Sequence, residues 1–355
     1  MKTLIRLLSI LILSVTTYSC SNDDDLVGIE EPETEKVLNV YALVKESSTT
    51  STPKLKVWKN EVSTPLTIEG DASVYGETLY VTSTDVYVGA SVRRLGSKYV
   101  ITIWKNGVAT PITDGANDAL ISSIFVNGND VYVVGTEKIN GITTARIWKN
   151  GMATSLSDKN SHVNSIYIEN NNIYAVGDIE IEGEDIATLW KNGSATSFKE
   201  AGIYTWFNSL YVINDKVHIA GGEYKPGNSL NPDVFSANVW VNGVKMSMKD
   251  TYFPDANAVF ASEGNVYVAG KDLLPGGTGM SIAQLWKNGV GIPLTDGSNN
   301  AGANDLYVFN KDVYVGGYEN NGAISVAKLW KNGESVSLSD GTVKAEVSSV
   351  IVIAQ

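Results

Sequence analysis

Short runs of alternating apolar and polar residues repeat along this chain. Between residues 122 and 157 four runs occur, at 122–126, 131–135, 145–148 and 153–157. They are rich in β-branched and aromatic residues, which favour strands. Asn-Gly pairs at 127–128 and 150–151 separate neighbouring runs and favour tight hairpin turns, because both residues accept positive φ angles. The pattern predicts four antiparallel strands joined by short turns.

The same unit recurs along the chain, marked by the motif Leu-Trp-Lys-Asn-Gly at 189–193. Its tryptophan has a counterpart in every copy, at spacings of 42 to 50 residues: Trp58, Trp104, Trp148, Trp190, Trp240, Trp286 and Trp330. A period of this length, with four short strands per unit, is typical of the blades of a β-propeller. Since each blade packs both faces on its neighbours, we expect these tryptophans to lie in the core between blades rather than to bind a ligand.

The two ends of the repeat complete each other. Residues 37–68 contain the second, third and fourth strands of a unit, and residues 348–354 match a first strand. We therefore predict an all-β, seven-bladed β-propeller over residues 37–355, closed by pairing of the N-terminal strands with the C-terminal strand. Such pairing leaves no long open sheet edge, which would otherwise favour aggregation.

Residues 1–19 have the features of an export signal. Lys2 and Arg6 precede an apolar run at 7–15 that is too short to span a bilayer, and Cys20 is the only cysteine of the chain. Residues 20–36 are acidic and poor in apolar residues, as expected for a flexible tether. With one cysteine, no disulfide can form within the chain.

Two of these features resemble known export signals. A small residue followed by Cys20 resembles the lipobox of bacterial lipoproteins, and residues 21–25 resemble the acidic tag that sends lipoproteins of the Bacteroidetes type to the cell surface. The resemblance implies a lipid on Cys20 and an outer-membrane location facing the cell exterior. The alternative is a secreted protein with an unmodified cysteine.

Charge and motifs exclude several classes of function. The net charge is −12 with no basic cluster, so no nucleic-acid partner is expected. The chain has two histidines, and His162, expected in an inter-blade turn, has no partner at metal-ligand spacing. No nucleophile, phosphate-binding or zinc motif occurs. We expect no catalytic residue, metal or cofactor, and a monomer.

The propeller repeats lack the signatures of the WD40 and sialidase families. Leu-Trp-Lys-Asn-Gly and Val-Tyr-Val-x-Gly instead resemble the repeats of seven-bladed propeller lipoproteins of the Bacteroidetes surface type. The resemblance implies a fold and a cellular location, but it indicates no ligand and no reaction.

Residues that break the repeat are the better candidates for a binding site, since the repeated ones already have a structural role. The longest spacing, between Trp190 and Trp240, contains an extended loop at 222–236. Aromatic residues outside the repeat lie in and beside it: Tyr204, Trp206, Tyr224, Phe235, Tyr252 and Phe253. We expect them to converge on one propeller face, where aromatic rings beside polar groups suit a sugar. The alternative is a hydrophobic plug that fastens the long loops.

Two sets of polar residues are further candidates. One is expected at the start of the innermost strands, facing the channel mouth, where it could bind a polar ligand or satisfy loop backbone: Glu77, Ser122, Asn164, Asn208, Asn257, Asn304 and Ser348. The other is an acidic residue ten positions after most of the repeated tryptophans, as at Asp114, Asp296 and Asp340. Glycine follows these three, which favours turn chemistry over a cation site.

These observations favour a lipid-anchored surface protein that binds a glycan or a protein partner through loops on one propeller face. The alternatives are a hydrolase or lyase that acts on an extracellular polysaccharide, and a scaffold subunit of an outer-membrane complex.

Overall fold

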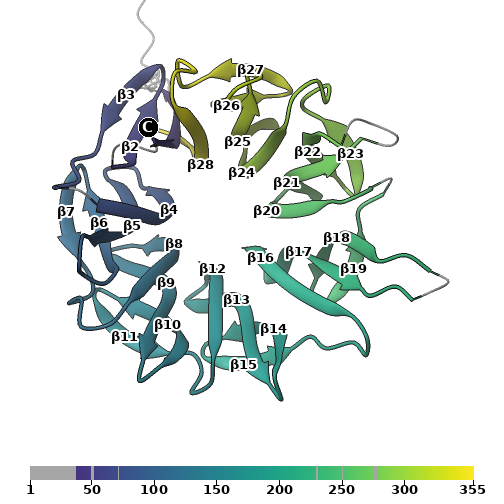
Figure 1. Ribbon diagram of the computed structural model, residues 1–355, viewed down its shortest axis with the longest axis horizontal. Helices are drawn as coiled ribbons and strands as arrows, with labels where there is room; N and C mark the ends of the chain where they lie inside the picture. Colours follow the sequence, from purple (N-terminus) through teal and green to yellow (C-terminus); the bar gives the residue numbers. More distant parts are fainter. Residues whose placement is uncertain (1–36, 49–51, 71, 229–230, 250, 275–278) are drawn as a thin grey trace, which may run out of the picture. The chain divides into compact units, whose positions relative to one another are not determined.

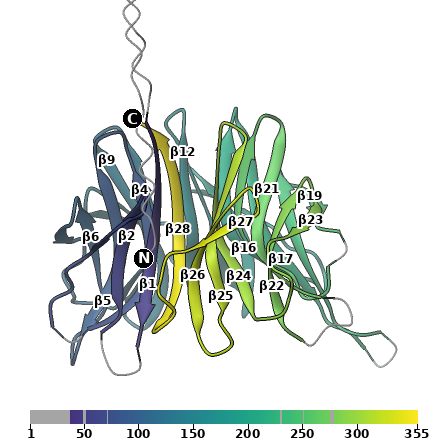
Figure 2. The same cartoon turned by 90° about the horizontal axis from the view of Figure 1, so that it is seen from above.

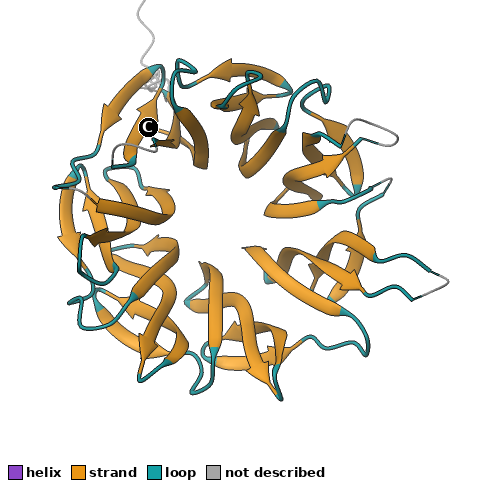
Figure 3. Cartoon of the chain, viewed as in Figure 1, coloured by secondary structure: helices purple, strands orange, loops and turns teal. Residues whose placement is uncertain are grey.

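The computed structural model describes residues 37–48, 52–70, 72–228, 231–249, 251–274 and 279–355, so the signal and tether expected for residues 1–36 lie outside the described residues. The described residues form seven four-stranded antiparallel sheets around a central axis (Figure 1). They contain strands and loops but no helix (Figure 3), and hence no helix that could cross a membrane. The predicted all-β, seven-bladed propeller is confirmed.

Each sheet is one blade, in which the strand named first lies nearest the axis and the strand named last lies at the rim. Blade 1 consists of β28 (Lys344–Ala354), β1 (Leu38–Ser47), β2 (Lys54–Lys59) and β3 (Val62–Pro65). Blade 2 consists of β4 (Ala72–Val81), β5 (Val86–Arg94), β6 (Val100–Lys105) and β7 (Val108–Pro111). Blade 3 consists of β8 (Ala119–Asn127), β9 (Asp130–Ile139), β10 (Ile142–Lys149) and β11 (Met152–Ser155). Blade 4 consists of β12 (Ser161–Glu169), β13 (Asn172–Ile181), β14 (Glu184–Lys191) and β15 (Ser194–Ser197).

The remaining three blades follow the same order. Blade 5 consists of β16 (Tyr204–Ile213), β17 (Lys216–Lys225), β18 (Val234–Val241) and β19 (Val244–Ser247). Blade 6 consists of β20 (Asp255–Ser262), β21 (Asn265–Leu273), β22 (Ser281–Lys287) and β23 (Val290–Pro293). Blade 7 consists of β24 (Ala301–Phe309), β25 (Asp312–Asn320), β26 (Ser325–Lys331) and β27 (Glu334–Ser337).

Blade 1 joins the two ends of the propeller, as predicted. β1 and β28 pair antiparallel from Leu38 opposite Ala354 to Ser47 opposite Lys344. Beyond the strands, the backbones of Val37 and Gln355 exchange hydrogen bonds of 2.8 and 2.9 Å. The ring is therefore closed by a strand from each end of the repeat, and β28 is not left unpaired.

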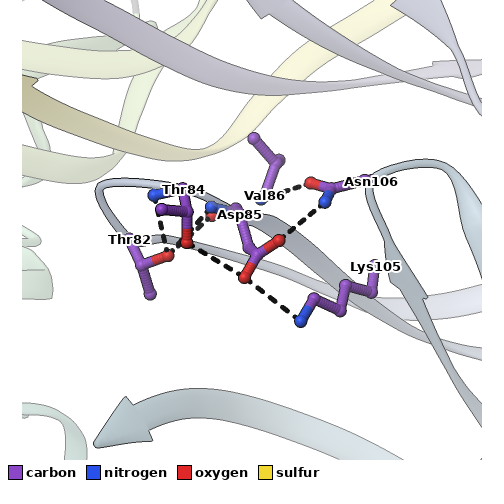
Figure 4. Close-up of polar contacts among 6 residues, drawn as sticks. All are labelled: Thr82, Thr84, Asp85, Val86, Lys105 and Asn106. Atoms are coloured by element: carbon purple, nitrogen blue, oxygen red, sulfur yellow. Dashed lines mark hydrogen bonds and ion pairs between the residues drawn. The ribbon is translucent and has the colours of Figure 1, made fainter. Parts of the chain in front are cut away.

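The repeated Lys-Asn-Gly turn is explained by its hydrogen bonds. In Figure 4, Asn106 Oδ1 accepts the N–H of Val86 at 2.8 Å and its Nδ2 donates to Asp85 at 2.7 Å. Lys105 Nζ lies 3.1 Å from the same carboxylate. It also lies 5.3 Å from the ring centroid of Tyr87. The asparagine adopts a left-handed φ of 50°, which Asn tolerates better than most residues. The motif thus fastens the third strand of a blade to the second.

The repeated glycine of the second strand lies opposite a β-bulge in the first. In blade 3 the register shifts between Ile121 and Ser123, and a Cβ on Gly135 would lie 1.9 Å from the carbonyl oxygen of Leu120. The bulge also interrupts the alternation of buried and exposed residues. The first strand, predicted to begin at Ser122, in fact begins at Ala119, because the residues before the bulge also pair with β9.

The repeated tryptophans lie between blades. Trp104 packs with Leu43 and Leu55 of the preceding blade and is 2% exposed. All the copies from blade 2 onward are buried, and Trp58 of blade 1 is half-buried against core residues of its neighbour. Their role is packing.

Candidate functional site

Four of the six candidate aromatic residues form one continuous row. The rings of Tyr204 and Tyr224 are nearly parallel with centroids 5.9 Å apart, and Tyr224 and Phe235 are 4.7 Å apart. Phe253, from the loop that enters blade 6, continues the row at 5.3 Å from Phe235. The first three are direct cross-strand neighbours on β16, β17 and β18, which places their side chains on one side of the sheet. We call these four residues the aromatic row.

The row is partly exposed. Relative exposure is 52% for Tyr204, 36% for Phe235 and 53% for Phe253, and Tyr224 between them is half-buried. Tyr252, next to Phe253, is 56% exposed. A buried plug would hide these rings, so the row presents a surface to solvent as well as contacts between blades 5 and 6.

The loop that carries Tyr252 and Phe253 is held by one buried carboxylate. Asp272, 5% exposed on β21, accepts the backbone N–H groups of Tyr252 at 3.0 Å, Phe253 at 2.8 Å and Leu273 at 2.8 Å. Three N–H groups directed at one carboxylate fix the backbone of the loop. The backbone from which the ring of Phe253 projects is therefore held in place by the protein itself.

Trp206 is not a member of the row, although it lies two residues from Tyr204 on the same strand. It is half-buried on β16, and its ring covers Gly222 on β17 so closely that a Cβ there would lie 2.2 Å from a ring atom. Among the described residues, none of the aromatic ring contacts joins Trp206 to the row. The second glycine of Gly221-Gly222 is thus explained by the space that this ring requires.

The aromatic row and the start of the described chain lie on opposite faces of the propeller. One face of the propeller carries the connections from second to third strands and from each blade to the next, and we call it the loop face. The aromatic row lies on this face, because β16 and β18 begin at the row and β17 ends at it. Figure 2 shows the extended β17–β18 connection on one side and the C-terminus on the other. Val37 bonds to Gln355, so it lies on the face opposite the row.

Two hollows flank the ends of the row. One of 290 Å³ is lined by Tyr204, Glu184, Lys199 and Glu200, together with apolar residues of blade 4. The other, of 360 Å³, is lined by Phe235, Phe253, Asp255, Lys271 and Ser281. The row therefore connects two shallow depressions that carry both charged and apolar groups.

The polar ring predicted at the channel mouth lies at the β-bulges, inside the innermost strands rather than at their first residues. Its four asparagines connect successive blades, because each Nδ2 donates to a backbone carbonyl of the next innermost strand. These bonds run from Asn164 to Phe207 (2.7 Å), from Asn208 to Ala256, from Asn257 to Ala303 and from Asn304 to Val347 (2.9 Å each). Glu77 instead pairs with Lys45 at 2.6 Å, and burial raises its pKa. Much of this ring is thus engaged in holding blades together.

Six aromatic side chains on the innermost strands form a second ring, which we call the aromatic collar. It was not predicted from the sequence. Its side chains touch in order around six blades, with centroids 4.2 to 5.0 Å apart: Tyr80, Phe125, Tyr167, Tyr211, Phe260 and Tyr307. Burial, with the nearby Tyr307 and Tyr211, raises the pKa of Tyr80 to about 12. Each collar residue follows a polar-ring residue by three positions, a spacing that could have revealed it.

Two further acidic residues, Asp305 and Asp178, are paired with hydrogen-bond donors. Asp305, next to Asn304, accepts the N–H of Val350 at 2.8 Å and that of Leu306 at 2.9 Å, and burial raises its pKa to about 7. His162, expected in an inter-blade turn, lies on β12 with Nδ1 2.9 Å from Asp178. The Asp178 carboxylate raises the pKa of His162.

The acidic residues after the repeated tryptophans belong to turns. Asp114, Asp296 and Asp340 each accept the backbone N–H two residues later, at 2.8 to 3.0 Å. Throughout the described part of the chain, no three His, Cys, Asp or Glu side chains come together as a metal site requires.

Comparison with known proteins identifies the fold. No protein-family model and no curated protein sequence matches the chain. Among solved structures it is similar to the β-propeller domain of the Trilobed protease from Pyrococcus furiosus, at 15% identity and a TM-score of 0.55, over 87% of this chain and 94% of that one. It is also similar to a "putative 6-phosphogluconolactonase" from Bacteroides fragilis, at 11% identity and a TM-score of 0.50, over 91% and 99%. The Pyrococcus domain has an open velcro topology, whereas β1 and β28 close the ring in this protein. Similarity at these identities establishes the architecture alone: the chain is a β-propeller of seven blades.

Proposed function

We propose that this protein is a lipid-anchored surface protein that binds its ligand, without catalysis, through the aromatic row on the loop face. The observation that carries the proposal is the row itself. Three of its four rings are at least 36% exposed, and the row runs from three strands of blade 5 to the loop that enters blade 6. Aromatic residues with both apolar area and a polar tip are enriched in binding surfaces.

The rigid support of the row favours this function. Asp272 fixes the loop of Phe253, and cross-strand pairing fixes Tyr204, Tyr224 and Phe235. A surface that is ordered before the ligand arrives loses less conformational entropy on binding. Loops on a rigid ring are also where binding residues concentrate.

The position of Val37 agrees with an anchored receptor. Residues before it are proposed to include a tether and a lipid on Cys20, and Val37 lies on the face opposite the row. A tether attached at that face leaves the loop face free to meet ligands outside the cell.

The test is a comparison of three proteins on immobilised cell-surface polysaccharide and protein fractions. Phe253→Ala should weaken retention at least tenfold while the melting temperature stays within about 2 °C, because a half-exposed ring contributes less to stability than a buried one. Tyr75→Ala, which removes a 58% exposed tyrosine from blade 2, is the control and should bind as the wild type does. Unchanged binding by Phe253→Ala would move the site off the row.

A further inference from the structure

We infer that the ligand of the aromatic row is a neutral oligosaccharide that extends from the Tyr204 end to the Phe253 end. This inference names the ligand class of the site described above and rests on the proposed function. It follows from the size of the exposed surface, the pairing of the charges around it and the position of the two hollows.

The exposed aromatic surface is small and linear. Tyr204, Tyr252 and Phe253 are each about half exposed, and Phe235 about a third. A large aromatic side chain has roughly 150–250 Å² of surface, so these four together expose roughly 400 Å². A stable protein interface takes about 800 Å² from each partner. The row and the neighbouring Tyr252 together thus offer about half of the area that a folded protein partner needs. The contacting rings form a single line, which fits a chain-like ligand.

The two lysines that line the hollows are paired with carboxylates. In the two hollows, Lys199 Nζ lies 2.9 Å from Glu184 and Lys271 Nζ lies 3.1 Å from Asp255. Such a pair offers a hydrogen-bond donor and an acceptor side by side without net charge. A sugar hydroxyl both donates and accepts, so it matches this arrangement.

An acidic ligand would be disfavoured at the same place. Uronate or sulfate groups would approach the carboxylates of Glu184, Glu200 and Asp255 in a protein of net charge −12. Of the described lysines, Lys199 and Lys271 line the hollows, and both have a carboxylate partner. Charge therefore selects a neutral glycan over an acidic one.

The ends of the row supply two places for sugar rings. Tyr204 and Phe253 terminate the line of contacting rings among the described residues, so each has a ring face that the row does not cover. Each borders its own hollow. Successive centroids 5.9, 4.7 and 5.3 Å apart separate these ends by more than one sugar ring can span. Binding should therefore strengthen with chain length.

The experiment uses the purified protein on an array of neutral and acidic oligosaccharides of two to eight sugars. We expect binding to a neutral series, with tetrasaccharides or longer at least tenfold tighter than disaccharides. Tyr204→Ala and Phe253→Ala should each lower the affinity for the long oligosaccharides at least tenfold. In each variant, the affinity for a long oligosaccharide should then be close to that of the wild type for a disaccharide. Tyr75→Ala again serves as the control.

Two results would overturn the inference and can be told apart from failure of the proposed function. Row-dependent binding of an acidic series, or of a purified surface protein, would refute the neutral glycan while leaving the row as the binding site. Glycan binding that neither Tyr204→Ala nor Phe253→Ala alters would refute both the inferred ligand and the aromatic row as the binding site.

Discussion

Asp305 provides a sharp test of how the ring is closed. It lies where blade 7 meets blade 1, and its carboxylate accepts the N–H of Val350 on β28 at 2.8 Å. Burial raises its pKa from 3.8 to about 7, although the hydrogen bonds to Val350, Leu306 and Ser349 act in the opposite direction. The folded protein thus binds this proton more tightly than the unfolded chain does. The perturbation that isolates the effect is Asp305→Asn, which is neutral at every pH and keeps an oxygen acceptor.

The sign and size of the effect follow from linkage. Because the folded-state pKa is raised, this group costs nothing below pH 4, and stability falls as pH rises from about 4 through about 7. A tenfold change in proton affinity corresponds to about 1.4 kcal/mol, which bounds the total at about 4 kcal/mol. The side chain is half-buried beside the channel, so we expect about 2 kcal/mol after solvent screening.

The assay is urea unfolding of both proteins at pH 4.5 and pH 8. Asparagine leaves one N–H with a poorer partner, which costs about 1 kcal/mol at either pH and so cancels in the comparison. Groups that titrate elsewhere cancel in the same way. The stability of Asp305→Asn relative to wild type should rise by about 1 kcal/mol between the two pH values, because about half of the total effect is already present at pH 4.5. Equal pH dependence in the two proteins would show that Asp305 does not titrate as this burial implies.

Three further predictions address the ring, the repeat and the anchor. Deletion of residues 347–355 removes Val347, Val350 and Val352, which are all buried. Burial of each valine stabilises the fold by about 1.5–3 kcal/mol, so the truncated protein should lose its cooperative thermal transition. An unchanged melting temperature would contradict closure by β28. Asn150→Ala loses two hydrogen bonds and places alanine at a φ of 50°. The free energy of unfolding measured with urea should therefore fall by about 2–3 kcal/mol. A fall of less than about 0.5 kcal/mol would show that the turn motif is dispensable. Cys20→Ala should release the protein from membranes washed with carbonate, and full retention would place the anchor elsewhere.

Local patterns predicted much of this fold and part of the candidate site. Asn-Gly turns and alternating strands are decided by residues close in sequence, and the two incomplete units could pair in only one way that closes a ring. The convergence of loops from blades 5 and 6 also followed from their order, because blades adjacent in sequence are adjacent in space. It could not be seen that Trp206 would lie over Gly222 while Tyr204 joined the row, since that depends on cross-strand register.

The sequence by itself determined the number of blades, their four strands and the closure of the ring, because each blade repeats the same local signals within a fixed period. Tertiary structure alone decided which contacts the residues around the axis make. A bulge in each innermost strand reverses the alternation of side chains, so residues such as Ser122 and Asn164 turn from expected strand starts into bulge positions within their strands. The aromatic collar, the asparagine bonds between blades and the raised pKa of Asp305 arise only where strands more than forty residues apart are brought around one axis, and burial in that shared space sets their properties.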